Sequence, residues 1–132
     1  MSIQLNGMTP LIQVFNMPRA LTFYRDTLGF TVVADSGNGD KSSWIWLRSG
    51  EIDLMLNDQY EPGHEPPAPP SERTRWHKDT CLYFGCPDPE AVYELLKARG
   101  VQLEPPKVSG YGMKQLYLKD PDGYGLCFQC RA

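Results

Sequence analysis

One order of predicted elements occurs twice along the 132 residues, and this duplication constrains the fold more than any other feature of the chain. In the first copy, side-chain alternation and turn residues predict strands at residues 9–15, 30–34, 42–48 and 52–57, with a helix after the first strand. In the second copy, the corresponding strands are expected at residues 80–86, 101–103, 114–119 and 125–130. Two copies of one βαβββ unit indicate a duplicated supersecondary structure, because a solenoid needs more repeats.

The two predicted helices begin and end at residues that suit those positions. Asn16 and Asp88 can accept hydrogen bonds from the free N–H groups of a first helical turn, and a proline follows each within two residues. Gly29 and Gly100 can adopt the left-handed conformation that ends many helices. We therefore predict an α+β protein of two tandem βαβββ modules. Their sheets are expected to be mixed or antiparallel, with the helices on the outer face.

A proline-rich connection separates the two modules of what is predicted to be a single domain over residues 1–132. Module 1 is expected at about residues 8–57, the connection at 58–79 and module 2 at about 80–130. The connection contains the run EPGHEPPAPP, which favours an extended, semi-rigid backbone. It also holds His64 and His77, which either titrate as an acid or base near neutral pH or are simply solvated.

The composition argues against several classes of partner. A net charge of −3 and an isoelectric point near 5.3 lack the basic footprint of a nucleic-acid-binding domain. No apolar run reaches the roughly 20 residues of a membrane span, and no secretory leader is recognisable. We therefore expect a cytoplasmic protein without a nucleic-acid or membrane partner. Its four cysteines, Cys81, Cys86, Cys127 and Cys130, are expected to be reduced thiols.

Two segments carry a resemblance to a known family. RALTFYRDTLGF at residues 19–30 resembles the first helix of the vicinal oxygen chelate superfamily, and DPDGYGLCF at residues 120–128 resembles its final hairpin. This superfamily contains glyoxalases, bleomycin-resistance proteins and extradiol dioxygenases. The resemblance implies that the sheet of each module curls into a half-barrel and that the paired half-barrel sheets form a cleft. Many members bind a divalent metal in this cleft, and others bind a drug without metal.

The resemblance also implies which positions would hold a metal. They lie seven residues before each helix cap and on the last strand of each module, which here gives Thr9, Asp53, Cys81 and Cys127. Threonine is a poor ligand and no histidine stands at any of the four positions, although one carboxylate and two thiols suit a soft metal such as zinc. No cofactor is favoured, and a divalent metal remains an alternative.

Strand alternation places mostly aromatic and uncharged side chains on the predicted cleft wall. The wall consists of Leu11, Gln13, Trp44, Trp46, Asp53, Met55, Tyr83, Gln115, Tyr117 and Gln129. Such a surface can stack flat rings or hold a cation against aromatic faces. Asp53 is its only acid and is the best candidate for a base or a cation anchor. Tryptophans on a strand also occur in cores and dimer interfaces.

Three functions follow as alternatives. The first is a metal-free binding protein of the bleomycin-resistance type that sequesters an aromatic or cationic compound. The second is a metal-dependent lyase, isomerase, thiol transferase or dioxygenase of the same superfamily. The third is a dimerising module without a ligand. A homodimer is expected in each case, because the modules leave exposed sheet edges and the resemblance implies pairing across a two-fold axis.

Overall fold

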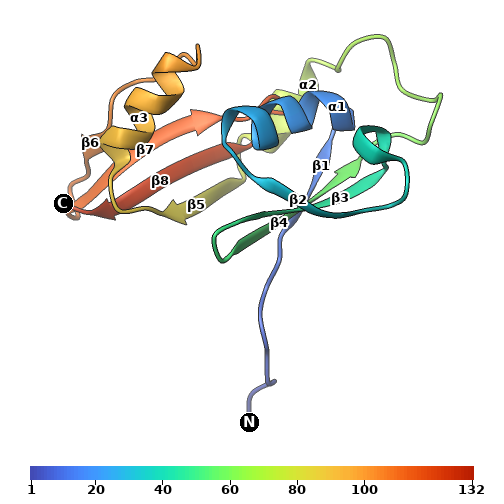
Figure 1. The fold of residues 1–132 in the computed structure, drawn as a ribbon. Helices are drawn as coiled ribbons and strands as arrows, with labels where there is room; N and C mark the ends of the chain where they lie inside the picture. The colour runs from blue at the N-terminus through green and yellow to red at the C-terminus, as the bar shows by residue number, and fades with distance from the viewer. The chain divides into compact units, whose positions relative to one another are not determined.

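The computed structural model describes residues 1–132 and divides into two compact units, Met1–Pro67 and Ala68–Ala132. Each unit contains one four-stranded mixed sheet with a helix packed on it (Figure 1). The predicted α+β class with two βαβββ modules is therefore confirmed. No helix is long and apolar enough to cross a membrane.

In unit 1, a parallel pair joins the first and last strands, and antiparallel pairs complete the sheet in the order β1-β4-β3-β2. Its strands are β1 (Leu11–Val14), β2 (Thr31–Asp35), β3 (Trp44–Ser49) and β4 (Ile52–Asp58). Helix α1 (Met17–Leu21) continues as a π-helical turn over Thr22–Thr27, and a short 3₁₀ turn covers Gly39–Lys41.

Unit 2 repeats this arrangement in the order β5-β8-β7-β6, again with the first and last strands parallel. Its strands are β5 (Cys81–Gly85), β6 (Lys107–Val108), β7 (Met113–Lys119) and β8 (Gly125–Arg131). Helix α3 (Pro89–Ala98) lies on β7 and β8, and a further helix, α2 (Glu72–His77), precedes β5.

The predicted helix boundaries are confirmed by their hydrogen bonds. The Asn16 side chain accepts from the backbone N–H of Arg19 at 2.9 Å, and the Asp88 carboxylate accepts from the N–H of Ala91 at 3.2 Å. Gly29 has φ of 89° and Gly100 has φ of 84°, the left-handed region that only glycine enters at little cost.

One face of each sheet is buried against its helix. In unit 1 this face carries Ile12, Val14, Ile45, Leu47, Leu54 and Leu56, each at most 5% exposed. Helix α1 covers it with Met17, Ala20 and Leu21. In unit 2, Leu116 and Leu126 take the same place. Each such side chain contributes about 1.5–3 kcal/mol, so the alternation of buried and partly exposed residues fixes the strand register.

The strand predicted at residues 101–103 is wrong. The corresponding strand is the short β6, Lys107–Val108, which pairs with β7 after the Pro105-Pro106 dipeptide. Proline has no N–H to donate to a sheet ladder, and pairing therefore begins only beyond Pro106.

The connection is also more structured than its composition suggested, because α2 forms within it and packs on the loop between β7 and β8. Arg73 of α2 donates from Nη2 and Nε to Oδ1 of Asp122, at 2.6 and 3.1 Å, and both side chains are almost fully buried. His77 donates from Nδ1 to the Asp122 carbonyl at 2.7 Å and stacks on Tyr124 with ring centroids 4.0 Å apart. The end of the connection is thus part of unit 2.

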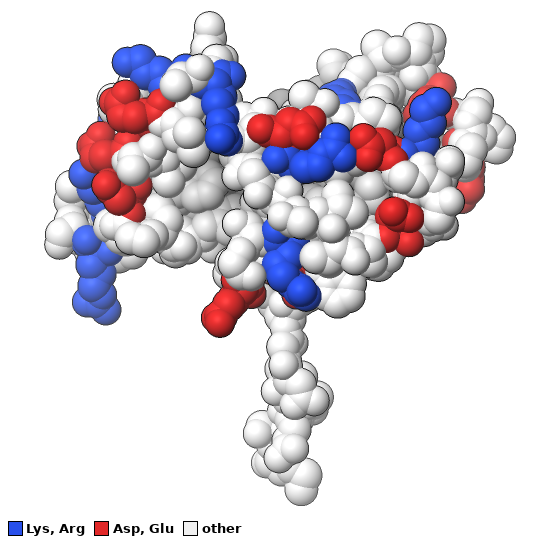
Figure 2. Space-filling view, in the orientation of Figure 1, with Lys and Arg blue, Asp and Glu red and all other residues white.

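The face of the molecule seen in Figure 2 carries acidic and basic side chains interspersed on each unit. Arg25, for example, binds both Asp26 and Asp40 at 2.9 Å. No broad patch of one sign is visible on that face.

We predict that Gly123→Ala destabilises unit 2 by more than Gly29→Ala destabilises unit 1. Both glycines have φ near 90°, so each alanine pays about 1–2 kcal/mol of backbone strain. A Cβ at Gly123 would in addition lie 2.6 Å from Cα of Thr74 in α2, whereas a Cβ at Gly29 meets nothing within 4 Å. The additional loss of stability in Gly123→Ala should be seen as faster amide hydrogen exchange in α2. Equal exchange of α2 in both variants would contradict this packing.

Candidate functional site

In unit 1 the predicted cleft residues lie together on the face of the sheet away from α1, which we call the helix-free face. Leu11 pairs with Met55, and Met55 pairs with Trp46 on its other side. Gln13 pairs with Asn57, which pairs with Trp44. Because paired residues share a face, this pairing directs these side chains to one face of the sheet. The two tryptophan rings lie 6.5 Å apart, centroid to centroid, and form one aromatic strip.

An arginine that sequence reasoning missed lies on this face beside the predicted acid. Arg48 donates from Nε to Oδ1 of Asp53 at 2.7 Å and from Nη2 to Oδ2 at 3.3 Å. Its guanidinium also lies over the Trp46 ring, 5.7 Å from the centroid. The hydrogen bonds from Arg48 hold the pKa of Asp53 below its usual range. The alternation of Trp44, Trp46 and Arg48 along one strand was the signal that could have revealed it.

This pairing corrects the role expected of Asp53. A general base needs a pKa near the working pH, and Arg48 moves the carboxyl in the opposite direction. The negative charge is also already balanced, so little of it is left for a cationic ligand. The Nε1 atom of Trp46 is buried with no well-formed hydrogen bond, although its approach to Asp53 lowers the pKa of that carboxyl slightly further.

In unit 2 the helix-free face carries the predicted residues of the second module. Tyr117 lies beside Tyr83, with the two hydroxyl oxygens 2.9 Å apart, and this hydrogen bond is the main cause of the raised pKa of Tyr117. Gln115 donates from Nε2 to Oε1 of Gln129 and to the Tyr111 hydroxyl, both at 2.9 Å. These hydrogen bonds orient polar groups on an otherwise flat aromatic surface.

The prediction that Asp53 and Cys127 occupy matching positions is wrong. Trp46 and Tyr117 correspond in the repeat, and their partners on the last strands are Met55 and Cys127. Asp53 pairs with Arg48 and lies two residues before Met55, so it is displaced by two positions from the place that matches Cys127. The counterpart of Cys127 is therefore Met55.

The side chains at the expected ligand positions are a poor donor set for a metal. Burial raises the pKa of the thiols of Cys81 and Cys127, whereas a metal binds the thiolate. Asp53 is held by Arg48, and Thr9 is a weak ligand. Within either unit, no three His, Cys, Asp or Glu side chains gather in a metal-binding group. His64 and His77 belong to no such group.

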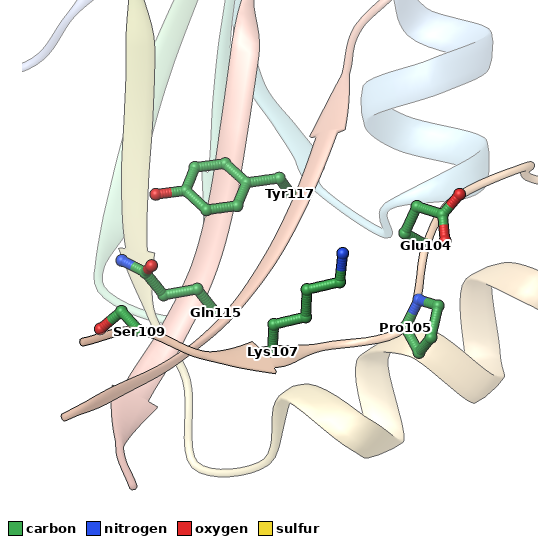
Figure 3. A pocket seen from close by; sticks show the side chains of 6 residues that line it. All are labelled: Glu104, Pro105, Lys107, Ser109, Gln115 and Tyr117. Carbon is green, nitrogen blue, oxygen red and sulfur yellow. The ribbon is translucent and has the colours of Figure 1, made fainter. Parts of the chain in front are cut away.

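Each unit contains one cavity of note. One of about 280 Å³ lies on the helix-free face of unit 2, where Lys107 of β6 and Gln115 and Tyr117 of β7 contribute to its lining (Figure 3). The other, of about 470 Å³, lies in unit 1 near the start of α1 and includes Asp58 and Glu65. Burial, and next the negative charge of Glu65, raise the pKa of Asp58 to about 6.

We predict opposite pH dependences for Asp58→Asn and Asp53→Asn. A raised carboxyl pKa means that the folded protein loses stability as pH rises from about 4 to 6, so Asp58→Asn should stabilise unit 1 above pH 6 and have little effect at pH 4. A lowered carboxyl pKa means that the ionised Asp53 stabilises the folded protein above the ordinary pKa of about 4. This stabilisation is lost as the pH falls below that value. Asp53→Asn should therefore destabilise unit 1 at pH 7, and progressively less below pH 4.

Urea unfolding of both variants and the unchanged protein, at pH values from 3.5 to about 8, measures these two curves. A stabilising effect of Asp58→Asn that is the same at all pH values would show that Asp58 is not protonated near pH 6.

Sequence comparison agrees with this architecture. The family model of the Glyoxalase/Bleomycin resistance protein/Dioxygenase superfamily matches residues 6–128, which is nearly the whole chain. The chain therefore belongs to this superfamily. A comparison with curated proteins gave no match.

Solved structures share the fold over nearly all of the chain. The bleomycin-binding protein of bleomycin-producing Streptomyces verticillus, complexed with copper(II)-bleomycin, is 23% identical over 96% of this chain and 97% of its own, with a TM-score of 0.66. An antibiotic-binding protein from Streptomyces sp. CB03234 is 23% identical over 98% of this chain and 100% of its own, with a TM-score of 0.67. A glyoxalase/bleomycin resistance protein/dioxygenase from Nocardioides is 18% identical, covering 98% and 86%, with a TM-score of 0.71.

Proposed function

We propose that the chain is a metal-free small-molecule binding protein that sequesters a flat aromatic compound against the helix-free faces of its sheets. The observation that carries this proposal is the ion pair between Arg48 and Asp53. It occupies the one acid that was expected to serve as a base, a cation anchor or a metal ligand. What remains accessible on these faces is mainly aromatic and amide surface, which suits binding more than proton transfer.

The chemistry of the remaining groups supports the same proposal. Trp44 and Trp46 form one aromatic strip and Tyr83 and Tyr117 form another. Flat rings gain about 0.5–1.5 kcal/mol per aromatic contact beyond the area that they bury. Two proteins of the same fold are described as binding bleomycin and an antibiotic, which fits a binding role for this scaffold. The free thiols fit a reducing compartment, and we propose the cytoplasm.

We predict that planar aromatic compounds, with copper(II)-bleomycin as a further probe, stabilise the protein in a thermal-shift assay. A ligand at 100 times its Kd adds about 2.7 kcal/mol. Trp44→Leu should weaken binding about three- to tenfold, because it removes one stacking surface. Trp76→Leu is the matched control, since Trp76 lies on α2, is 64% exposed and belongs to neither aromatic strip. Equal loss in both variants would contradict the proposed location.

The metal content of the purified protein tests whether it is metal-free. Protein purified without chelator is expected to contain far less than one metal ion per chain by elemental analysis, because no thiolate and no unpaired carboxylate is offered at the expected positions. Stoichiometric zinc, iron or manganese would overturn it in favour of a metal-dependent enzyme.

We further propose a homodimer. The outer strands β1 and β2 of one sheet, and β5 and β6 of the other, each have one edge without a partner in their own sheet, and such edges favour pairing with another strand. Light scattering should give about twice the 14.9 kDa mass of one chain. A mass of one chain at micromolar concentration would contradict the dimer.

A further inference from the structure

The cavity on the helix-free face of unit 2 differs in chemistry from the aromatic strips around it. It is lined by Glu104, Pro105, Lys107, Ser109, Gln115 and Tyr117 (Figure 3). Sequence reasoning found only the last two of these, because it placed the neighbouring strand before the proline pair. The cavity volume of about 280 Å³ exceeds the roughly 150 Å³ that admits a benzene ring, so a flat ring fits it.

Gln115 presents a fixed acceptor to this cavity. Both of its amide hydrogens are used, because Nε2 donates to Gln129 and to Tyr111 at 2.9 Å. The side chain is almost fully buried, and its amide orientation is set by these two hydrogen bonds. Its Oε1 atom has no partner within the protein. A ligand with an N–H or O–H donor at this place would complete the hydrogen bonding of Gln115.

Lys107 supplies a positive charge to this cavity. It pairs with Gln115 across β6 and β7, so the two side chains share a face, and Figure 3 shows its ammonium group directed toward the space between Tyr117 and Glu104. No ion pair holds it, whereas Lys114 on the opposite face of β7 binds Glu90 at 3.2 Å. Glu104 lies on the rim and opposes a second negative charge on a ligand.

Together these groups change the expected charge of the ligand from positive to negative. The acid that suggested a cationic compound, Asp53, is neutralised by Arg48, and Lys107 is the unpaired cation that lines the cavity of unit 2. The Tyr117 ring, 46% exposed, and the Pro105 ring offer flat apolar walls between which a ring can lie. A carboxylate or phenolate on that ring is the group that an ammonium binds most strongly.

We propose that this cavity binds the ring of an aromatic monoacid, with its anionic oxygen on the ammonium of Lys107 and a neighbouring donor on Oε1 of Gln115. The inference rests on the proposed binding function and names the class of compound bound. An acid with two negative groups is disfavoured by Glu104. A cationic aromatic compound is disfavoured by Lys107.

Three probes with one ring system test the sign of the charge: 2-naphthoate, 2-naphthamide and 2-naphthylmethylammonium. Titration calorimetry at low salt should show naphthoate bound about five- to tenfold more tightly than the amide, with the ammonium compound weakest. Raising the salt concentration should shrink the difference, because the lysine is exposed and its attraction is screened.

Variants of two lysines test whether the preference for naphthoate arises at Lys107. Lys107→Met should remove the preference for naphthoate while leaving the amide affinity within about twofold, and Lys107→Arg should retain the preference. Lys114→Met is the matched control, because this lysine lies on the other face of the same sheet, and it should retain the preference. Circular dichroism confirms that each variant is folded.

The outcomes separate this inference from the proposed function. Binding of all three probes with equal affinity, or a preference for naphthoate that survives Lys107→Met, overturns the inference and leaves the binding function intact. Binding of copper(II)-bleomycin or other planar compounds without binding of any naphthyl probe also overturns it. Failure of every compound to bind overturns both.

Discussion

The alternation of side chains across each strand is the constraint on which the rest of this protein depends. Residues such as Ile45 and Leu47 are buried under a helix, and the intervening Trp44 and Trp46 are therefore directed to the other face. A shift of one residue would expose the core and bury the aromatic strip, so the energy of the core holds the binding surface in place. The position of each side chain on the helix-free face is thus set by the packing on the other side of the sheet.

Features that depend on interactions between residues close in sequence could be predicted, and features that depend on residues far apart in sequence could not. Strands and helix caps depend mainly on neighbours in the chain, and these predictions are confirmed except for the strand expected at residues 101–103. The match of Asp53 with Cys127 failed because it depends on pairing across the strands, in which Asp53 is displaced by two positions. Helix α2 was missed because Arg73 is buried by an aspartate 49 residues away. The cavity at Lys107 was missed because the proline pair moved β6 along the chain.

The electrostatics of the helix-free faces supports the proposed binding function. A catalytic cleft needs a group with a pKa shifted toward neutrality or an ion that lowers the pKa of water. Here Asp53 is shifted away from neutrality by Arg48, the thiols of Cys81 and Cys127 remain protonated, and the one carboxyl with a pKa near 6, Asp58, lies by another cavity. The helix-free faces therefore combine stable charges with flat rings, which favours recognition over reaction.

The packing of α2 on the loop after β7 also sets the length of the covalent tether between the units. Unit 1 ends at Pro67 and α2 begins at Glu72, so the connection between them can extend to at most about 18 Å. A tether of this length holds each unit at a local concentration of the order of millimolar around the other. Two sheets with only millimolar mutual affinity would then be substantially associated within one chain. Loosening α2 would lengthen the tether and lower that concentration without changing a single residue on either sheet.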